Sequence, residues 1–165
     1  MNKTGIIYGI NGPVIYLKGD SGFKISEMVY VGKDHLVGEV IGLKKGMTTI
    51  QVFEETTGLR PGETVIGTGD AISVLLGPGI IHNIFDGIQR PLEEIAKTSG
   101  KYISRGVSVD SLDTEKKWHT HITVKEGDVV GPGTIIAETQ ETASILHKSM
   151  VPPNITEGTV IKAAP

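Results

Sequence analysis

The chain has 165 residues, of which 38% are apolar, 21% are charged and none is cysteine, and its formal net charge is −3. This length predicts one domain or two small ones. A slightly acidic chain without a basic cluster gives no sign of binding nucleic acid, and the lack of cysteine excludes disulfides and thiolate metal sites. Without an 18-residue apolar run or a signal-peptide pattern, we expect a cytoplasmic protein that does not insert into the membrane.

The first part of the chain has the pattern of many short strands. The whole chain has 22 glycines, about twice the usual share of ~7%, and they recur at short intervals. Gly46 lies where a tight hairpin needs a positive φ, and Pro61-Gly62 is a turn signal. Strands are expected at residues 4–10, 13–19, 27–32, 36–45, 48–55 and 71–76. Six such strands predict a small closed barrel, which has no open edge.

A helical segment is expected to follow the barrel. Residues 80–88 carry an apolar stripe at helical spacing, formed by Ile80, Ile81, Ile84, Phe85 and Ile88. A second short helix should begin at Pro91, with acidic residues in its first turn, Lys97 near its end and Gly100 after it. Both helices are shorter than the ~12–15 residues that an isolated helix needs in water, so they must pack on something.

The pattern returns to strands from about residue 101. Strands are expected at 118–124, 134–138, 143–153 and 157–165, with a turn at Gly127-Asp128. Because the chain stops directly after a strand-like run, we expect a fragment whose second β domain is incomplete. The predicted fold is therefore mainly β, with an N-terminal closed barrel, a short helical linker and the start of a β-sandwich.

This second β segment resembles lipoyl and biotinyl carrier domains. The shared pattern is V-x-x-G-D-x-V-x-x-G-x-x-I at residues 124–136, followed by a hairpin and a G-T-V triplet. Carriers have a modified lysine at the tip of the central hairpin, whereas residues 140–144 read QETAS and Lys148 comes later. The resemblance therefore implies a lipoyl-like sandwich used as a scaffold, without the swinging arm.

Catalytic signatures are missing from the sequence. It has no G-x-x-x-x-G-K-[ST] phosphate loop, no strand followed by G-x-G-x-x-G, no G-x-S-x-G and no H-E-x-x-H. The pairs Gly67/Gly69 and Gly77/Gly79 are interpreted as turns. We therefore assign no catalytic, cofactor-binding or metal-binding residue.

Several polar residues are possible site candidates. His119 and His121 would share one face of a strand as possible metal ligands, but spacing supplies no third ligand and exposed histidines are favoured. His82 and His147 are interpreted as structural or surface residues. Residues 54–63 could form an acidic binding edge, but we favour a solvated loop with weak ion pairs. The charged residues concerned are Glu54, Glu55, Arg60 and Glu63.

Three strings resemble one family. QVFEETTGLRPGE (51–63), LGPGIIHNIFDGIQRPL (76–92) and HKSMVPPNITEGTV (147–160) are similar to the N-terminal part of the catalytic A subunit of V-type ATPases, with the archaeal and bacterial V/A-type ATP synthases nearest. The likeness covers nearly the whole chain.

The resemblance implies three parts. Residues 1–75 would be a barrel that joins its neighbours in a crown, 76–100 a linker to a nucleotide-binding domain, and 101–165 the start of the bulge domain. It implies that the full-length enzyme uses ATP and Mg²⁺ as cofactors. It also implies that ATP hydrolysis or synthesis is coupled to proton or sodium transport. The implied partners are B subunits, other A subunits and, through the bulge, a peripheral stalk. The 165-residue chain alone would have no enzymatic activity. The alternative is a free-standing β-rich binding module.

Overall fold

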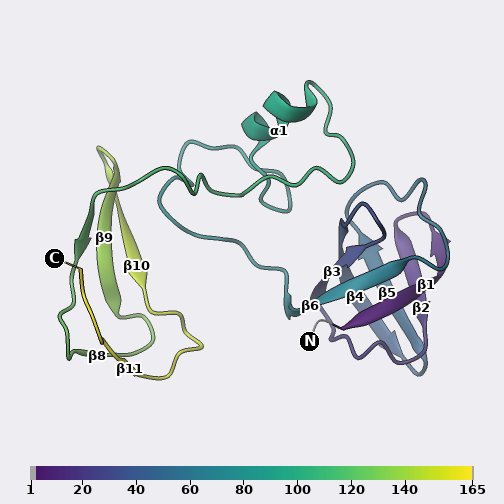
Figure 1. Ribbon diagram of the computed structural model, residues 1–165, viewed down its shortest axis with the longest axis horizontal. Coiled ribbons are helices and arrows are strands. Elements are labelled where there is room, and N and C mark those ends of the chain that lie inside the picture. Colours follow the sequence, from purple (N-terminus) through teal and green to yellow (C-terminus); the bar gives the residue numbers. More distant parts are fainter. Residues whose placement is uncertain (1–2, 165) are drawn as a thin grey trace. The chain divides into compact units, whose positions relative to one another are not determined.

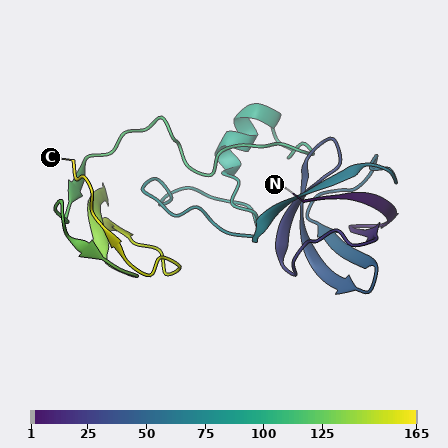
Figure 2. The same ribbon diagram turned by 60° about the horizontal axis from the view of Figure 1, so that its bottom comes forward.

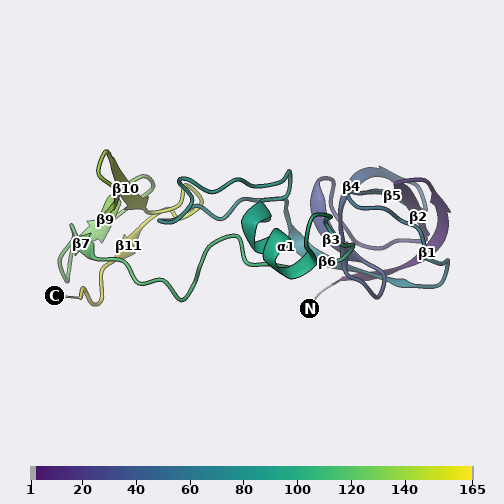
Figure 3. The same ribbon diagram turned by 90° about the horizontal axis from the view of Figure 1, so that it is seen from above.

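The computed structural model describes residues 3–164 and contains a closed six-stranded barrel (Figure 1). The strands follow the order β1-β2-β5-β4-β3-β6, and β1 pairs with β6 to close the ring. Their bounds are β1 (Thr4–Asn11), β2 (Val14–Lys18), β3 (Glu27–Val31), β4 (Leu36–Lys44), β5 (Met47–Val52) and β6 (Thr64–Ala71). Figure 3 shows the strands as a ring. The predicted barrel is confirmed.

Alternating side chains fill the barrel. On β3, Val29 and Val31 point inward, as do Leu36 and Val40 on β4, and all four are fully buried. This two-residue period is the geometry of a strand with one buried face. The core consists of Ile7, Ile15, Leu17, Phe23, Val29, Val31, Leu36, Val40, Ile50, Val52, Leu59 and Val65.

The turns of the barrel agree with the glycine signals. Gly46 has φ +73° between β4 and β5, and Gly62 has φ +95° in the turn that precedes β6. Such φ values strain residues that carry a Cβ. Both turn predictions are confirmed.

The position of the sixth strand differs from the prediction. We expected it near residues 71–76, but β6 spans Thr64–Ala71 and includes Gly67 and Gly69, which we had interpreted as a turn. Gly67 is buried, and a Cβ there would collide with the Glu27 carboxylate and lie 2.7 Å from the Phe23 ring. The glycine is therefore a strand residue that makes room for two inward side chains.

Of the two expected linker helices, only the second exists. Residues 80–88 form turns, and the expectation of a helix there was wrong. The second helix is α1 (Leu92–Ser99), with Glu93 and Glu94 in its first turn and Lys97 in its last. Gly100 follows with φ +76°, and its amide donates to Ala96 O at 2.9 Å, which ends the helix as predicted.

The second β segment forms two small antiparallel sheets. One has the order β10-β9-β7 and the other pairs β11 with β8. The bounds are β7 (Thr120–Ile122), β8 (Val129–Val130), β9 (Ile135–Thr142), β10 (Ile145–Met150) and β11 (Gly158–Thr159). In Figure 2 the green and yellow strands of this part lie side by side. The turn between β9 and β10 falls at Ala143-Ser144, within the predicted hairpin tip.

The described chain divides into two compact units. Within the described residues, one unit combines residues 3–74 with Ile95–Ser108, and the other combines Leu75–Glu94 with residues 109–164. In the first unit, Arg105 pairs with Asp34, and Gly106 N donates to Glu54 Oε2 at 2.8 Å, so the 95–108 segment is fastened to the barrel. Within residues 3–164, none of the helices has the length and apolar character to cross a membrane.

Candidate functional site

The most organised polar contacts of the second unit surround residues 75–91, which we call the 75–91 loop. Its two ends are joined by one side chain: Gln89 Oε1 accepts from Leu75 N at 2.6 Å, and Gln89 Nε2 donates to Leu75 O at 2.7 Å. The amide group thus pairs with Leu75 as a neighbouring strand would. Gln89 is 8% exposed and has φ +61°. A non-glycine residue at this φ is uncommon, and here the two bonds hold it in place.

An ion pair closes the end of the same loop. Asp86 Oδ2 accepts from Arg90 Nε at 2.7 Å, while Asp86 Oδ1 accepts from Arg90 N at 2.8 Å and Ile88 N at 3.1 Å. Burial alone raises the pKa of Asp86, but the hydrogen bonds from Arg90 and Ile88 and the charge of Arg90 lower it more, so the pKa lies below its usual value. The carboxylate form therefore stabilises the turn that leads to α1.

The middle of the loop is held by a residue 60 positions away. Glu141 Oε1 accepts from Gly79 N at 2.8 Å and from Ile81 N at 2.9 Å, and the Glu141 side chain is only 2% exposed. Gly79 has φ +105°, and a Cβ there would lie 3.5 Å from the Trp118 ring. The loop thus packs on Trp118 while an acidic side chain binds its backbone.

A β-bulge orients this glutamate. Along the β9–β10 hairpin, Ile145 pairs with Thr142 but Leu146 pairs with Gln140, so Glu141 has no cross-strand partner. Bulges redirect side chains and interrupt pairing. The hairpin tip, where carrier domains have a lysine, therefore presents a carboxylate to the 75–91 loop. We did not predict that Glu141 would bind the 75–91 loop. The signal in the sequence was its alternation with Ala137 and Thr139, the buried residues of β9.

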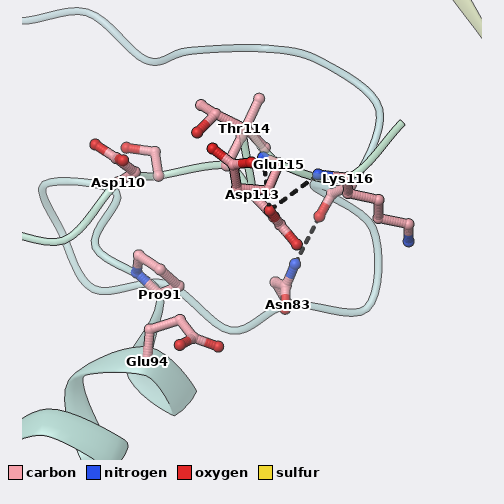
Figure 4. A pocket seen from close by; sticks show the side chains of 11 residues that line it. Asn83, Pro91, Glu94, Asp110, Asp113, Thr114, Glu115 and Lys116 are labelled. Carbon is pink, nitrogen blue, oxygen red and sulfur yellow. Dashed lines mark hydrogen bonds between the residues drawn. The ribbon is translucent and has the colours of Figure 1, made fainter. Parts of the chain in front are cut away.

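A cavity of about 510 Å³ lies beside the loop and is lined by residues from 79–94 and 110–116 (Figure 4). Its charged lining residues are Glu94, Asp110, Asp113, Glu115 and Lys116. Asp113 Oδ1 accepts from Glu115 N at 3.0 Å and Lys116 N at 3.1 Å, which closes its own turn. Lys116 Nζ lies 4.0 Å from the centre of the Trp118 ring. Among residues 3–164, no group of three or more His, Asp or Glu side chains is placed to hold a metal ion.

The histidines considered in the sequence have separate positions. His119 and His121 are exposed on and beside β7, and His82 is exposed with φ +71°. His147 lies on β10 as expected, but it is half-buried and its Nδ1 is 3.8 Å from Glu141 Oε2. Lys148 is outside the hairpin tip, and its Nζ is 3.8 Å from Glu138 Oε1.

The acidic residues of the 54–63 loop accept hydrogen bonds, from backbone amides at Glu54 and Glu63 and from a hydroxyl at Glu55. Glu63 Oε1 accepts from Arg60 N at 3.2 Å, and Glu63 Oε2 accepts from Lys33 N at 3.3 Å. Glu55 Oε1 accepts from the Thr57 hydroxyl at 2.5 Å. Together with the bond from Gly106 to Glu54, these contacts give the loop a structural role that we had not predicted.

Two family models match this chain and define its class. The ATP synthase alpha/beta family, beta-barrel domain, matches residues 7–69, and the barrel-sandwich domain of the ATP synthase alpha/beta subunit, a separate model, matches residues 109–165. These matches coincide with the closed barrel and with the second β segment. They confirm the predicted fold class.

Individual relatives specify the family further. The V-type ATP synthase alpha chain of Halothermothrix orenii is 50% identical over 165 residues, which is 100% of this chain and 28% of the relative. The A subunit of the A-type ATP synthase of Pyrococcus abyssi is 50% identical over 164 residues, 99% of this chain and 16% of the relative. The V-type ATP synthase alpha chain 2 of Clostridium tetani is 52% identical over 152 residues, 92% of this chain and 26% of the relative. The chain belongs to the family of V-type and A-type ATP synthase A subunits, and it spans less than a third of the length of these relatives.

Proposed function

We propose that this chain acts as the N-terminal assembly part of the A subunit of a rotary V/A-type ATP synthase. In the whole enzyme, ATP hydrolysis or synthesis would be coupled to proton or sodium transport. The observation that supports this most directly is an identity of 50% to a V-type ATP synthase alpha chain over all 165 residues. The two family models support it further, because one matches the barrel at residues 7–69 and the other matches the second β segment at residues 109–165.

The barrel would take its place in a ring of A and B subunits. Since all six strands are paired on both sides, contacts to neighbours must be made by outward side chains rather than by strand addition. Several of these are large, apolar and exposed, namely Ile6, Tyr8, Ile41, Leu43 and Phe53. Heterologous contacts of this kind generate a closed ring when the rotation between subunits closes.

The remaining residues would connect the barrel to a nucleotide-binding domain and contact a peripheral stalk. In the predicted division, residues 1–75 form the crown barrel, 76–100 lead toward a nucleotide-binding domain, and 101–165 begin a bulge that contacts a peripheral stalk. The clamped 75–91 loop supports the connecting role, because three side chains fix its path. The complex would be cytoplasmic and peripheral to the membrane.

ATP and Mg²⁺ would be used by other parts of such an enzyme. Their binding needs a phosphate-cradling loop with its lysine and hydroxyl, and no G-x-x-x-x-G-K-[ST] occurs in this sequence. The residues present do not fit the nucleotide, so no catalytic step is assigned to them.

A chimera tests the proposal. The aligned segment of the Halothermothrix orenii alpha chain is replaced by these 165 residues and expressed with the other head subunits of that enzyme. We expect a head complex that assembles and hydrolyses ATP. In the control, the original Halothermothrix orenii segment is joined to the rest of its alpha chain at the same two junctions.

A chimera that folds but does not co-purify with the other head subunits would contradict the proposal. That outcome would favour a free-standing binding module. Separate chimeras that exchange only residues 7–69 or only residues 109–165 would show which unit determines the result.

A further inference from the structure

One carboxylate oxygen of Glu141 accepts hydrogen bonds, and the other accepts none within the described residues. Its Oε1 accepts the two amides of Gly79 and Ile81, whereas its Oε2 is buried and has no hydrogen-bond partner within the described residues. A buried oxygen of a carboxylate without a partner is costly. This position therefore favours a positively charged group next to Oε2.

His147 is the group that can supply that charge. Its Nδ1 lies 3.8 Å from Glu141 Oε2, which is too long for a hydrogen bond but close enough for an ion pair once the imidazole is protonated. His147 pairs in register with Thr139, whose side chain is buried and bonds to the Thr120 hydroxyl at 2.9 Å. The imidazole thus lies over the inward face of the sheet, on the same side as Glu141.

We propose that Glu141 and His147 form a proton-dependent latch on the 75–91 loop. When His147 takes up a proton, its Nδ1–H closes on Glu141 Oε2, and the paired carboxylate holds the amides of Gly79 and Ile81 more firmly. Histidine side chains change charge between about pH 5 and 8. The extra hold is therefore present on the acidic side of this range and is lost as the pH rises through it.

The other charged groups nearby have separate partners or positions. Glu138 pairs with Lys148 and lies opposite His121 in register, Lys116 covers Trp118, Asp113 closes its own turn, and His82 is exposed beyond Ile81. By strand alternation, Glu138 and Lys148 occupy the sheet face opposite Thr139 and His147. Within residues 3–164, His147 is thus the titratable side chain that lies next to Glu141 Oε2, at 3.8 Å.

Amide hydrogen exchange of the 165-residue chain tests the latch. Protection factors of Gly79 and Ile81, corrected for the intrinsic effect of pH, are measured by NMR at about pH 5.5 and about pH 8. We expect protection at the lower pH to be about threefold higher, the size of a modest ion pair. In His147→Gln this difference should vanish, while the matched change His121→Gln on β7 should leave it intact.

Glu141→Gln provides the second test, because it keeps an oxygen to accept from Gly79 and Ile81 but removes the charge. In this variant the protection factors of Gly79 and Ile81 should be independent of pH, and the NMR spectrum should remain that of a folded chain. The latch is refuted if wild-type protection is equal at both pH values, or if the pH dependence persists in His147→Gln. These outcomes concern contacts within one unit, so they are separate from the success or failure of the ATP synthase chimera.

Discussion

Gln89 binds Leu75 through both ends of its amide group, at 2.6 Å to the Leu75 nitrogen and 2.7 Å to the Leu75 oxygen. The contact joins residues 14 positions apart and makes the intervening segment a closed loop. Because Gln89 is only 8% exposed, its amide group forms its hydrogen bonds with Leu75 rather than with water, and the two bonds join the ends of the loop.

Replacing this glutamine should open the loop. Gln89→Ala removes both bonds, and we expect a loss of about 1–2 kcal/mol in local stability because Leu75 must find other partners. The measurement is the exchange rate of the Leu75 amide. Gln51→Ala, at an exposed glutamine of β5, is the matched control and should change nothing at Leu75. Equal Leu75 exchange rates in the wild type and Gln89→Ala would show that the amide pairing is not stabilising.

The buried Glu27 should be essential to the barrel. It is 1% exposed and accepts from Lys24 N at 2.8 Å and Gly69 N at 2.9 Å. Glu27→Ala leaves these amides without their acceptor, and we expect a loss of about 2–4 kcal/mol in the free energy of unfolding, since each unmet group costs about 1–3 kcal/mol. Urea titration followed by circular dichroism measures it. Glu39→Ala on β4 is the control; a similar loss there would argue against a specific role for Glu27.

Two glycines of β4 should respond differently to a methyl group. A Cβ at Gly38 would lie 2.8 Å from Gln51 O, a backbone atom that cannot move without breaking the β4–β5 pairing. A Cβ at Gly42 would meet only Thr49 side-chain atoms at 3.5 and 3.6 Å, an ordinary contact. We expect Gly38→Ala to lower stability by about 1–3 kcal/mol and Gly42→Ala to be nearly neutral. Thermal unfolding of both variants measures the difference. Equal melting temperatures would show that the two glycines do not differ in their need for space.

Acid should loosen the 75–91 loop through Asp86. Its pKa is lowered in the folded chain because the hydrogen bonds and charge of Arg90 outweigh the effect of burial. The stabilisation is therefore complete above the ordinary value near 3.9 and is lost as the pH falls through the lower folded-state pKa. Trp118, the single tryptophan, packs near Gly79, and its fluorescence reports on this unit.

The variant Asp86→Asn should lack this acid-dependent step and should be less stable than the wild type at neutral pH. Asp110→Asn, at an exposed aspartate of the same unit, is the control and should retain the wild-type acid profile. If both variants titrate like the wild type, Asp86 does not stabilise the loop.

Calorimetry should detect no nucleotide binding by the 165-residue chain. Titration with ATP and magnesium is expected to give only the heat of dilution, because the sequence lacks a phosphate-cradling loop. Saturable heat at a 1:1 ratio would show that the assembly role is incomplete.

Local patterns predicted the barrel well. β1 to β5 lie within a few residues of their expected bounds, since each alternates inward apolar residues and is followed by a glycine-rich turn. β6 was misplaced because Gly67 and Gly69 resemble a turn. Their small size serves the packing of Glu27 and Phe23, which no local pattern could indicate.

The clamped loop shows where such patterns fail. The apolar spacing of residues 80–88 favours a helix, yet Gly79, His82 and Gln89 have positive φ values and Ile84 is 67% exposed. Contacts from Glu141 and Gln89 outweigh the weak helical preference of a short segment. Bonds between residues 60 positions apart depend on the tertiary structure, so the candidate site was not predictable from the sequence, although the family was.

The continuous pairing of the six barrel strands has a consequence for how such a protein changes over time. Because the strand ladder closes on itself within one chain, a molecule that adjoined the barrel would be recognised by its outer surface rather than through a strand edge. Substitutions on that surface would then change which molecules can adjoin the barrel while the strand pairing remains intact.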